Sequence, residues 1–598
     1  MIASENKGRS GFAATLRERT AKEKPDNVQY NKQIAALRSQ FSAMGKPESL
    51  QELLLRAAAV YADRTQVVEF TAGGNISYSA KQLCEDAAAL AFSLTKAGLA
   101  GKNIGIIGRN GYAWLVSFFA ACCGVGTAVP LDKELRSEKL KYLIEKADVE
   151  LVLCDDSLLA GVREAAGDVP CIPFVGTQED TRSLPMLIKQ GRELLADGTL
   201  PFSQREVHSQ DIAAIVFTSG TTGANKGVML THGNLIENAY SLTKVLPPMA
   251  SALSVLPMNH VFELGCTVLT AISINGILYI NDSLRHLLKN AVACQPQMIV
   301  VVPAFIDFLY KELDTQLKKN GIKGGAASIA TAPAPIRALV KKAVVTYFGG
   351  SLPYFACGGA AVRKDYLQTL QSLGLEIYLG YGLSESAPIA ALNMHADKKP
   401  ESVGLPIVEN GHFRIRNADA DGIGEILLCG DNICAGYYKD EDATAVSFED
   451  GWFCTGDYGK LDADGELTIT GRKKNLIVLD NGKNICPEEI ENYLLTQVNG
   501  IREAVVFESV KVYGETQSKI IAAAVYADPK DLTNSDLAQA EHKLKEALVS
   551  ASFKLPAFMR IGDVQIFWQE FPKTATMKII RQEVIALYNQ KKGENENA

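Results

Sequence analysis

A run of hydroxyl side chains and glycines that ends in a lysine is the first segment whose residue types could do chemistry. It reads Thr-Ser-Gly-Thr-Thr-Gly-Ala-Asn-Lys-Gly and follows the apolar residues 213–217. Glycines let a backbone turn tightly and bring its N–H groups close to an anion, and hydroxyls and a lysine add further donors. The segment therefore predicts a loop that binds phosphate groups through Thr218, Ser219, Gly220, Thr221, Thr222, Gly223 and Lys226.

Two other interpretations of this segment are open. The segment is not a Walker A loop, because no glycine directly precedes Lys226 and no serine or threonine follows it. A P-loop kinase is therefore the weaker of the two phosphate-binding interpretations. Taken alone, the segment also fits a flexible surface loop that binds nothing.

Two short motifs further along the chain supply carboxylates and a cation. Tyr381–Glu385 follows an apolar strand, and ligands of α/β folds bind at that end of a strand, so Glu385 suits a Mg²⁺ ion. Thr455–Asp457 adds an acid for sugar hydroxyls, and Arg472 adds a cation for phosphate or ribose. A lone glutamate after a strand is usually just solvated, so only the combination with the loop predicts a nucleotide site.

The segments between these motifs alternate between helical and extended patterns. Alternation of this kind predicts an α/β chain with largely parallel sheets, here a large domain of two α/β subdomains. Helices are expected at 50–61 and 80–97, with a further helix beginning at His232 or Asn234. Strands are expected at 104–108, 127–131, 151–154, 213–218, 253–257, 298–303 and 376–381.

The pattern changes after about residue 400, where short strands at 413–416, 425–429 and 467–470 are separated by Asp-Gly turns. These strands predict a small antiparallel β-barrel that closes the first body. A β-α-β pattern follows, with a helix start at Pro487–Glu489. We therefore expect a polar arm with one amphipathic helix (1–47), a large domain (48–471) and a small mobile α+β lid domain (472–598).

Composition narrows the class of protein. The chain has 598 residues and a formal net charge of −7, which gives no reason to expect nucleic acid as a partner. The twelve cysteines include no C-x-x-C pair, and no signal peptide is evident, so we expect reduced thiols and a cytoplasmic protein. The apolar run 114–131 is broken by two glycines and a proline, which favours a buried helix and strand over a transmembrane segment. Peripheral contact with the inner face of a membrane is left open.

In order and spacing, the motifs resemble the signatures of the adenylate-forming superfamily. This group comprises acyl- and aryl-CoA synthetases, luciferases and the adenylation domains of peptide synthetases. The resemblance covers roughly residues 48–590 and rests on five segments, namely Thr218–Gly227, Tyr381–Glu385, Thr455–Asp457, Gly471–Lys474 and Pro572–Arg581. Within the group, Pro257–Glu263 and Lys573–Lys578 are most similar to long-chain fatty acid–CoA ligases.

The resemblance implies a role for each matching position. Thr218 and Glu385 would hold Mg²⁺, and His260 would border the acyl-adenylate. Lys578 would bridge the substrate carboxylate and the α-phosphate of ATP. Lys474 would be the hinge on which the C-terminal domain swings between half-reactions. The remaining nucleotide contacts would be Ser219–Lys226 for the β- and γ-phosphates, Gly358, Gly359, Ala360, Ala361, Tyr381, Gly382 and Ser384 around adenine, and Asp457 and Arg472 at the ribose.

The implied reaction joins a carboxylic acid to ATP, giving acyl-AMP and pyrophosphate, and then transfers the acyl group to coenzyme A. The expected substrate is a medium- to long-chain fatty acid, in a pocket near Met258–Thr267 and Gly358–Val362, and Gly482 and Lys483 are candidate CoA contacts. Three alternatives are open: transfer to a carrier protein in trans, a short-chain or aromatic acid as substrate, and a nucleotide-binding pseudoenzyme. The expected assembly is a monomer or a homodimer.

Three positions depart from the family pattern. Ser384 replaces the usual threonine and keeps its hydroxyl group. Asn225 stands where proline is common, which predicts a more mobile phosphate loop. Met577 stands where many relatives have glycine, a variation that favours the long-chain branch of the family.

Overall fold

The computed structural model describes residues 44–176, 182–195, 201–219, 225–247, 249–322, 324–360, 362–394, 399, 401–478, 484–513, 516–531, 536–574 and 577–596. The amphipathic helix expected in the N-terminal arm, the tip of the phosphate loop (220–224) and the candidate CoA contacts Gly482 and Lys483 lie outside these residues. Within them, no helix is both long and apolar enough to cross a membrane.

A six-stranded sheet forms the first α/β unit. Its strand order is β6-β5-β3-β4-β7-β8, and every neighbouring pair is parallel except the antiparallel hairpin β7–β8. The strands are β3 (Asn103–Ile107), β4 (Thr127–Leu131), β5 (Val149–Cys154), β6 (Cys171–Pro173), β7 (Ile212–Ser219) and β8 (Asn225–Thr231). The hairpin corrects the expected loop, since Thr218 pairs with Lys226 and Ser219 with Asn225. Residues at both ends of the predicted loop are thus strand residues.

A nine-stranded sheet forms the second unit, in the order β15-β14-β13-β12-β11-β9-β10-β1-β2. Its central strands are parallel, whereas β2, β14 and β15 at its edges pair antiparallel. The strands are β1 (Thr65–Thr71), β2 (Gly74–Ser79), β9 (Ser251–Ser254), β10 (Ile277–Ile280), β11 (Met298–Val301), β12 (Tyr354–Cys357), β13 (Glu376–Gly382), β14 (Ile389–Asn393) and β15 (Leu405–Pro406). The prediction of largely parallel sheets is therefore confirmed.

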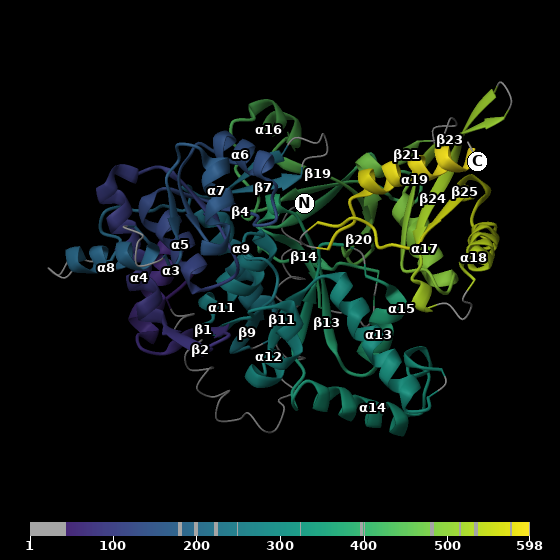
Figure 1. The fold of residues 1–598 in the computed structure, drawn as a ribbon, viewed down its shortest axis with the longest axis horizontal. Coiled ribbons are helices and arrows are strands. Elements are labelled where there is room, and N and C mark those ends of the chain that lie inside the picture. Colours follow the sequence, from purple (N-terminus) through teal and green to yellow (C-terminus); the bar gives the residue numbers. More distant parts are fainter. Residues whose placement is uncertain are drawn as a thin grey trace.

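The two sheets share one layer of helices (Figure 1). A single hydrophobic core joins Ile104 and Val216 of the six-stranded sheet to Leu278 and Val300 of the nine-stranded sheet. The helices in this layer are α3 (Leu50–Tyr61), α4 (Ala80–Leu94), α5 (Tyr112–Ala120), α9 (His232–Val245), α10 (Val261–Glu263) and α11 (Thr270–Ser273), with α8 (Leu184–Leu195) packed beside α4. Because strands buried on both faces need apolar side chains on both, the continuous Ile, Val and Leu runs of these strands follow from the layering.

Separate helices cover the outer faces. The six-stranded sheet is covered by α6 (Ser137–Lys146) and α7 (Leu159–Ala166). The nine-stranded sheet is covered by α12 (Leu287–Cys294), α13 (Pro303–Lys319), α14 (Ala334–Tyr347) and α15 (Lys364–Ser372). The run 114–131 consists of most of α5, a buried turn and β4, which confirms the expected buried helix and strand.

Local sequence signals fix several helix starts. Helix α9 begins with a capping box in which the Thr231 hydroxyl accepts the Asn234 N–H, and the Asn234 side chain accepts the Thr231 N–H. Helix α3 is capped by Ser49, whose hydroxyl accepts the N–H of Glu52. Helix α17 (Pro487–Gln497) begins at the expected proline, with two glutamates in its first turn. Each of these starts confirms the prediction from sequence.

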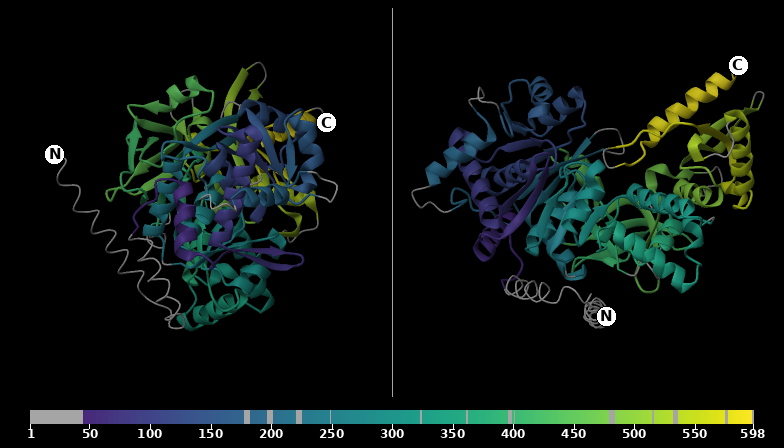
Figure 2. Two further views of the ribbon diagram at one scale, coloured as in Figure 1. Left: turned by 90° about the vertical axis from the view of Figure 1, so that its left-hand side faces the viewer. Right: turned by 60° about the horizontal axis from the view of Figure 1, so that its bottom comes forward.

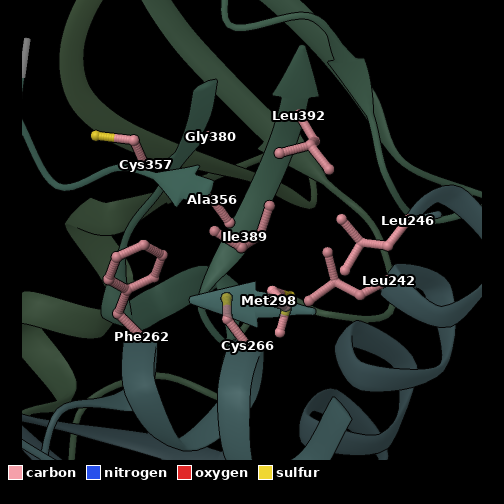
Figure 3. Close-up of a pocket in the computed structure, with 10 residues that line it drawn as sticks. All are labelled: Leu242, Leu246, Phe262, Cys266, Met298, Ala356, Cys357, Gly380, Ile389 and Leu392. Carbon is pink, nitrogen blue, oxygen red and sulfur yellow. The ribbon is translucent and has the colours of Figure 1, made fainter. Parts of the chain in front are cut away.

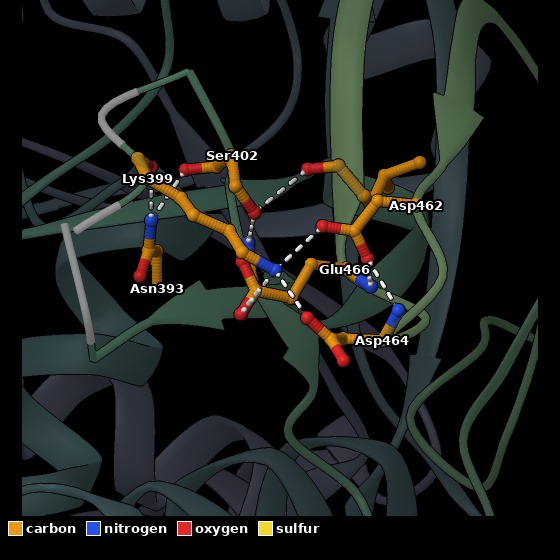
Figure 4. A network of polar contacts seen from close by, with 8 residues as sticks. Asn393, Lys399, Ser402, Asp462, Asp464 and Glu466 are labelled. Atoms are coloured by element: carbon orange, nitrogen blue, oxygen red, sulfur yellow. Dashed lines mark hydrogen bonds and ion pairs between the residues drawn. The ribbon is translucent and has the colours of Figure 1, made fainter.

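A five-stranded antiparallel sheet follows, made of β16 (His412–Arg416), β17 (Gly424–Cys429), β18 (Phe448–Glu449), β19 (Trp452–Leu461) and β20 (Leu467–Arg472), with α16 (Glu441–Ser447) before β18. Among the described residues no strand pairing closes this sheet into a ring, so the expected barrel stays a prediction. Lys399 ties the sheet to the nine-stranded one, because its Nζ lies 2.7 Å from Oδ2 of both Asp462 and Asp464 (Figure 4). The backbone of Lys399 is held in turn by the side-chain amide of Asn393 at the end of β14.

The last elements gather on one side of the molecule (Figure 2). A three-stranded sheet, β23 (Glu503–Tyr513), β24 (Thr516–Tyr526) and β25 (Ile561–Phe567), packs with α17, α18 (Leu537–Ser552) and α19 (Arg581–Glu596). A short hairpin, β21 (Ile477–Val478) and β22 (Asn484–Ile485), precedes α17. The domain boundary at 471–472 stays a prediction.

Candidate active site

Glu385 and Lys226 are brought together by a tyrosine that the sequence analysis did not single out. Glu385 follows β13, and Lys226 lies on β8 of the other sheet. The Tyr437 hydroxyl donates a hydrogen bond of 2.9 Å to Oε1 of Glu385, while Lys226 Nζ lies 4.4 Å from the centre of the Tyr437 ring. Burial raises the pKa of Glu385, and hydrogen bonds and the Lys226 cation oppose that rise. Glu385 and Lys226, which the sequence analysis placed around the phosphates, therefore both contact Tyr437.

The strand pairing of β8 explains how Tyr437 reaches this position. Val228 and Tyr437 form an antiparallel bridge, and the N–H groups of Met229 and Tyr438 bond to the carbonyls of Gly436 and Gly227. Thr218 lies opposite Lys226 in the hairpin, which places it at the same end of the sheet. No sequence motif marks Tyr437, because its partner strand is more than 200 residues away.

Two asparagines hold the backbone that carries Glu385. Asn238 of α9 donates to the carbonyls of Ser386 and Ile389, and Asn432 donates to the same two carbonyls, at 2.8–3.2 Å. The side chains of both asparagines are buried. A signal for Asn238 was present in the sequence, since Asn238 lies one turn after the capping residue Asn234, on the same face of α9.

Asp457 is the centre of a second cluster. One carboxylate oxygen accepts the Tyr381 hydroxyl at 2.9 Å, and the other lies 3.1 Å from Nε of Arg472. Asp457 and Arg472 are direct partners in the antiparallel pair β19–β20, so strand register sets this ion pair. Asp457 is only 3% exposed. The structure thus joins Tyr381, Asp457 and Arg472, which the sequence analysis placed around adenine and ribose. Gly382 and Ser384 lie beside Tyr381, at the end of β13 and just after it.

Lys578 comes from the far end of the chain and lies within electrostatic range of this cluster. Burial, with a smaller contribution from the Arg472 cation, lowers the pKa of Lys578 to about 8, and the Asp457 carboxylate opposes the shift. The lysine is therefore close enough to both members of the Asp457–Arg472 pair to sense their charges. Lys474 also senses Arg472, and burial lowers its pKa as well.

The turn that presents Lys578 is closed by its own backbone. The Thr574 N–H donates to the Lys578 carbonyl at 2.9 Å, and the Lys578 N–H donates to the Thr574 hydroxyl at 3.2 Å. Met577 has φ = 61°, in the left-handed region that glycine adopts without strain. The geometry therefore gives a physical reason why a glycine suits this position. At the base of the turn, Lys573 pairs with Glu503 of β23 at 2.5 Å.

His260 immediately precedes α10. Its Nε2 is 3.9 Å from Oδ2 of Asp132, which follows β4, and burial lowers the pKa of His260 so that the ring is neutral at neutral pH. The loop before His260 is fixed by Asn110, whose side chain donates to the Leu256 carbonyl and accepts the Met258 N–H. Asn110 is a second residue that sequence reasoning missed.

The glycines expected beside adenine follow β12. A Cβ on Gly358 would lie 3.1 Å from the Gly380 carbonyl oxygen and 3.2 Å from the Phe262 ring, so this position requires glycine for close packing. Gly359 has φ = 89°, and Ala360 follows it. Phe262 lies beside Gly358, which is expected near adenine, and also lines the apolar cavity described next.

An apolar cavity begins at this point (Figure 3). Phe262 of α10 and Gly380 of β13 line it, and α9 and the strands β11, β12 and β14 supply other walls. Its lining residues are Leu242, Leu246, Phe262, Cys266, Met298, Ala356, Cys357, Gly380, Ile389 and Leu392. Of the two ranges expected to line an acyl pocket, Met258–Thr267 contributes Phe262 and Cys266. The contribution of α9 was missed, because that helix was assigned only to the phosphate loop.

A second apolar pocket adjoins the first, but its side chains are packed together and leave no free space for a water molecule in this conformation. Leu246, Met298 and Ala356 line both, and the second adds Pro247, Met249, Tyr354 and Tyr378. Tyr354 begins β12, whereas Cys357, which lines the first cavity, ends it. The two cavities together therefore follow the sheet from its carboxyl edge to its amino edge.

Comparison with known proteins gives the class. The profile of the AMP-binding enzyme family matches residues 54–438, and that of the AMP-binding enzyme C-terminal domain matches residues 474–591. Because the first match spans more than half of the chain, the protein belongs to the AMP-binding enzyme family, the adenylate-forming superfamily that the motifs resemble. All twelve cysteines are unpaired, as expected.

Individual relatives are more distant. The long-chain-fatty-acid–CoA ligase FadD15 of Mycobacterium bovis is 29% identical over 75% of this chain and 77% of its own length. The 2-succinylbenzoate–CoA ligase of Bacillus cereus is 26% identical over 91% of this chain and all of its own. Among solved structures, ATP-bound MatB from Rhodopseudomonas palustris has a TM-score of 0.71 at 23% identity, covering 90% of this chain and 98% of that one. This likeness supports the fold.

Proposed function

We propose that this protein is an AMP-forming acid–CoA ligase that activates a medium- to long-chain fatty acid. The observation that carries the proposal is the approach of Lys578 to the Asp457–Arg472 pair. A cation there can neutralise charge when a substrate carboxylate approaches the α-phosphate of ATP, and two anions would otherwise repel each other. In this proposal the carboxylate oxygen bonds to the α-phosphorus while the bond to the leaving pyrophosphate breaks.

In the second step the thiolate of coenzyme A attacks the acyl carbonyl, and the bond to AMP breaks. Asp457 and Arg472 would hold the ribose, and the uncharged His260 would border the acyl-adenylate without adding a second cation. The hinge at Lys474 would let the C-terminal domain withdraw Lys578 between the steps. Carrier-protein loading is the alternative for this second half-reaction.

The residues present fit a magnesium ion. Among the described residues no group of three His, Cys, Asp or Glu side chains could hold a metal by itself. Mg²⁺ is commonly held by one or two carboxylates together with substrate phosphates, so a single half-buried glutamate suits it. Glu385, with Thr218 at the same sheet edge, would hold the ion, which would neutralise the charge of the leaving phosphates. Tyr437 would orient Glu385 through its hydrogen bond to Oε1.

The substrate class is inferred from the paired cavities. Their described lining residues include no charged side chain. A flexible hydrocarbon chain suits such a lining, whereas a second carboxylate, as in succinylbenzoate, would lack a cation to pair with. A long-chain fatty acid would lie with its carboxylate near Phe262 and Gly380 and its chain along β12.

The remaining assignments follow from this function. We propose a large domain up to residue 471, a small lid domain from residue 472, and a monomer or homodimer. A cytoplasmic enzyme with peripheral membrane contact fits a substrate that dissolves in lipid.

ATP–pyrophosphate exchange across a series of acids from acetate to oleate tests the proposal. Exchange is expected to rise with chain length, and AMP release is expected to require CoA. Activity confined to short or aromatic acids would reject the long-chain assignment, and product formation on a carrier protein alone would reject the ligase. Unchanged acyl-CoA formation by Lys578→Ala would reject the role of the lysine.

A further inference from the structure

Helix α14 carries an apolar stripe that faces solvent. Ile336, Leu339, Ala343 and Tyr347 are three, four and four residues apart, which places them on one face of a helix. Ile336, Leu339 and Tyr347 are 44%, 70% and 43% exposed. The helix runs along the lower margin of the molecule in Figure 1. An isolated exposed leucine is ordinary, but a periodic stripe marks a contact surface.

The stripe borders the face by which α14 joins its own domain, because the buried Val340 lies one helical turn from both Ile336 and Ala343. Val340 is buried and Val344 packs against the core beneath α12, α13 and α15. Between α14 and β12, the Gly349 carbonyl accepts a hydrogen bond of 2.6 Å from the side chain of Gln295, just after α12. Ile336, Leu339 and Tyr347 stay partly exposed beside these contacts, so their outer side is available to another surface.

The chain segment that contains the stripe is basic, and Glu312 of α13 is an acidic neighbour, since burial and then the charge of Glu312 raise the pKa of Tyr347. Residues 315–364 contain eight lysines and arginines and no aspartate or glutamate, in a chain whose net charge is −7. Among the described basic residues of this segment, only Lys318 and Arg363 form ion pairs, with Asp314 and Asp365 just outside it. Lys341 and Lys342 lie within α14 and are exposed; Lys342, three residues after Leu339, flanks the stripe, whereas the Lys341 side chain lies against Gly374.

We propose that α14 docks this protein on an anionic lipid surface. The apolar stripe would enter the boundary between headgroups and acyl chains, and the lysines would contact lipid phosphates. A second copy of the chain fits less well, because pairing two α14 faces by symmetry would bring two basic surfaces together.

The position of α14 relates this surface to the expected substrate. The helix leads into the amino end of β12, where Tyr354 lines the second cavity. A fatty acid held in a bilayer would be delivered to the side of the sheet at which the cavities end. Only this link to the substrate rests on the proposed function; the docking itself does not.

Flotation of the full chain with vesicles tests the docking. Binding is expected to vesicles of phosphatidylcholine mixed with phosphatidylglycerol, to be much weaker with phosphatidylcholine alone, and to fall as salt is added. The Ile336→Gln, Leu339→Gln double variant and the Lys341→Gln, Lys342→Gln double variant are each expected to lose about tenfold or more in vesicle affinity. These side chains are exposed, so the fold should be kept.

Matched controls come from the opposite margin of the molecule. Val446 on α16 is 76% exposed, and Lys139 and Lys141 lie on α6. Val446→Gln and the Lys139→Gln, Lys141→Gln variant should bind vesicles as the unchanged protein does. Equal binding to both kinds of vesicle, or unchanged binding by both α14 variants, would overturn the proposal. So would a dimer in sedimentation that the Ile336→Gln, Leu339→Gln variant abolishes.

A soluble acid separates docking from catalysis. With hexanoate, which needs no lipid surface, the α14 variants should form acyl-CoA at the unchanged rate. If no acid supports ATP–pyrophosphate exchange in any form of the protein, the proposed ligase fails while the vesicle result still decides the docking.

Discussion

The hydroxyl of Tyr437 lies 2.9 Å from Oε1 of Glu385, so one oxygen of this half-buried carboxylate has a hydrogen-bond donor within the protein. The same tyrosine ring faces the ammonium group of Lys226. Because a cation is attracted to the face of an aromatic ring, one side chain orients both the expected metal ligand and the expected phosphate ligand. The geometry of the site therefore depends on a residue outside every motif that predicted it.

Removing the Tyr437 hydroxyl should mainly disturb Glu385. Tyr437→Phe keeps the ring under Lys226 and deletes the hydrogen bond, and a bond to a charged group is worth about 1.5–3 kcal/mol. We expect ATP–pyrophosphate exchange to fall by about tenfold or more, with a higher Mg²⁺ concentration needed for half-maximal rate. Tyr437→Leu should in addition raise the KM for ATP. Tyr240→Phe on α9 is the control; an equal loss there would show a general effect of removing a tyrosine hydroxyl.

Adenylation should weaken at a pH that is low for a lysine. The cationic form of Lys578 is the useful one, it exists below its pKa of about 8, and it is lost as pH rises through that value. Exchange measured from pH 6 to pH 10 should therefore decline around pH 8. Arginine does not titrate in this range, so whatever activity Lys578→Arg keeps should show no decline near pH 8. A decline shared by both proteins would assign it to another group.

The two asparagines beneath Glu385 should act as partial substitutes for each other. Asn238→Ala and Asn432→Ala each leave one donor for the carbonyls of Ser386 and Ile389. Each single change should destabilise by about 1 kcal/mol, and the double change by more than the sum, because buried carbonyls then lack a partner. Denaturant unfolding of the four proteins gives this coupling, and simple additivity would exclude the shared role.

Met577 should be replaceable by glycine with a gain in stability. A left-handed residue with a Cβ is strained by about 1–2 kcal/mol, and Met577→Gly removes that strain, partly offset by added freedom in the unfolded chain. We expect a net gain of up to about 1 kcal/mol in denaturant unfolding. Met577→Ala keeps the strain and is the control, so a gain of equal size there would assign the effect to the methionine side chain.

Filling the junction of the two cavities should shorten the preferred acid. Ala356 lines both, and Ala356→Leu would put a larger side chain between them. The ratio of kcat/KM for oleate to that for hexanoate should fall by about tenfold or more, the scale on which pockets discriminate by methylene groups. An unchanged ratio would place the acyl chain elsewhere.

Sequence patterns were sufficient wherever the deciding interaction is local. Helix α9 begins at His232 because Thr231 and Asn234 cap each other three residues apart, and α17 begins at its proline. Parallel strands were identifiable because burial on both faces leaves a continuous apolar run. The hairpin of Thr218 and Lys226 was predicted as a loop, because glycines and threonines also occur in loops and the strand partner is set by register.

The chain by itself determined which chemical groups are available: the hydroxyls and Lys226, Glu385, the Asp457–Arg472 combination and Lys578, in an order typical of AMP-binding enzymes. Only the tertiary structure decided how they meet. It joined Lys226 to Glu385 through Tyr437, set Lys578 against a strand pair more than 100 residues away, and laid an apolar cavity between α9 and the sheet. Side-chain type and local spacing are written in the sequence, whereas contacts between distant segments depend on strand register and on how the layers pack.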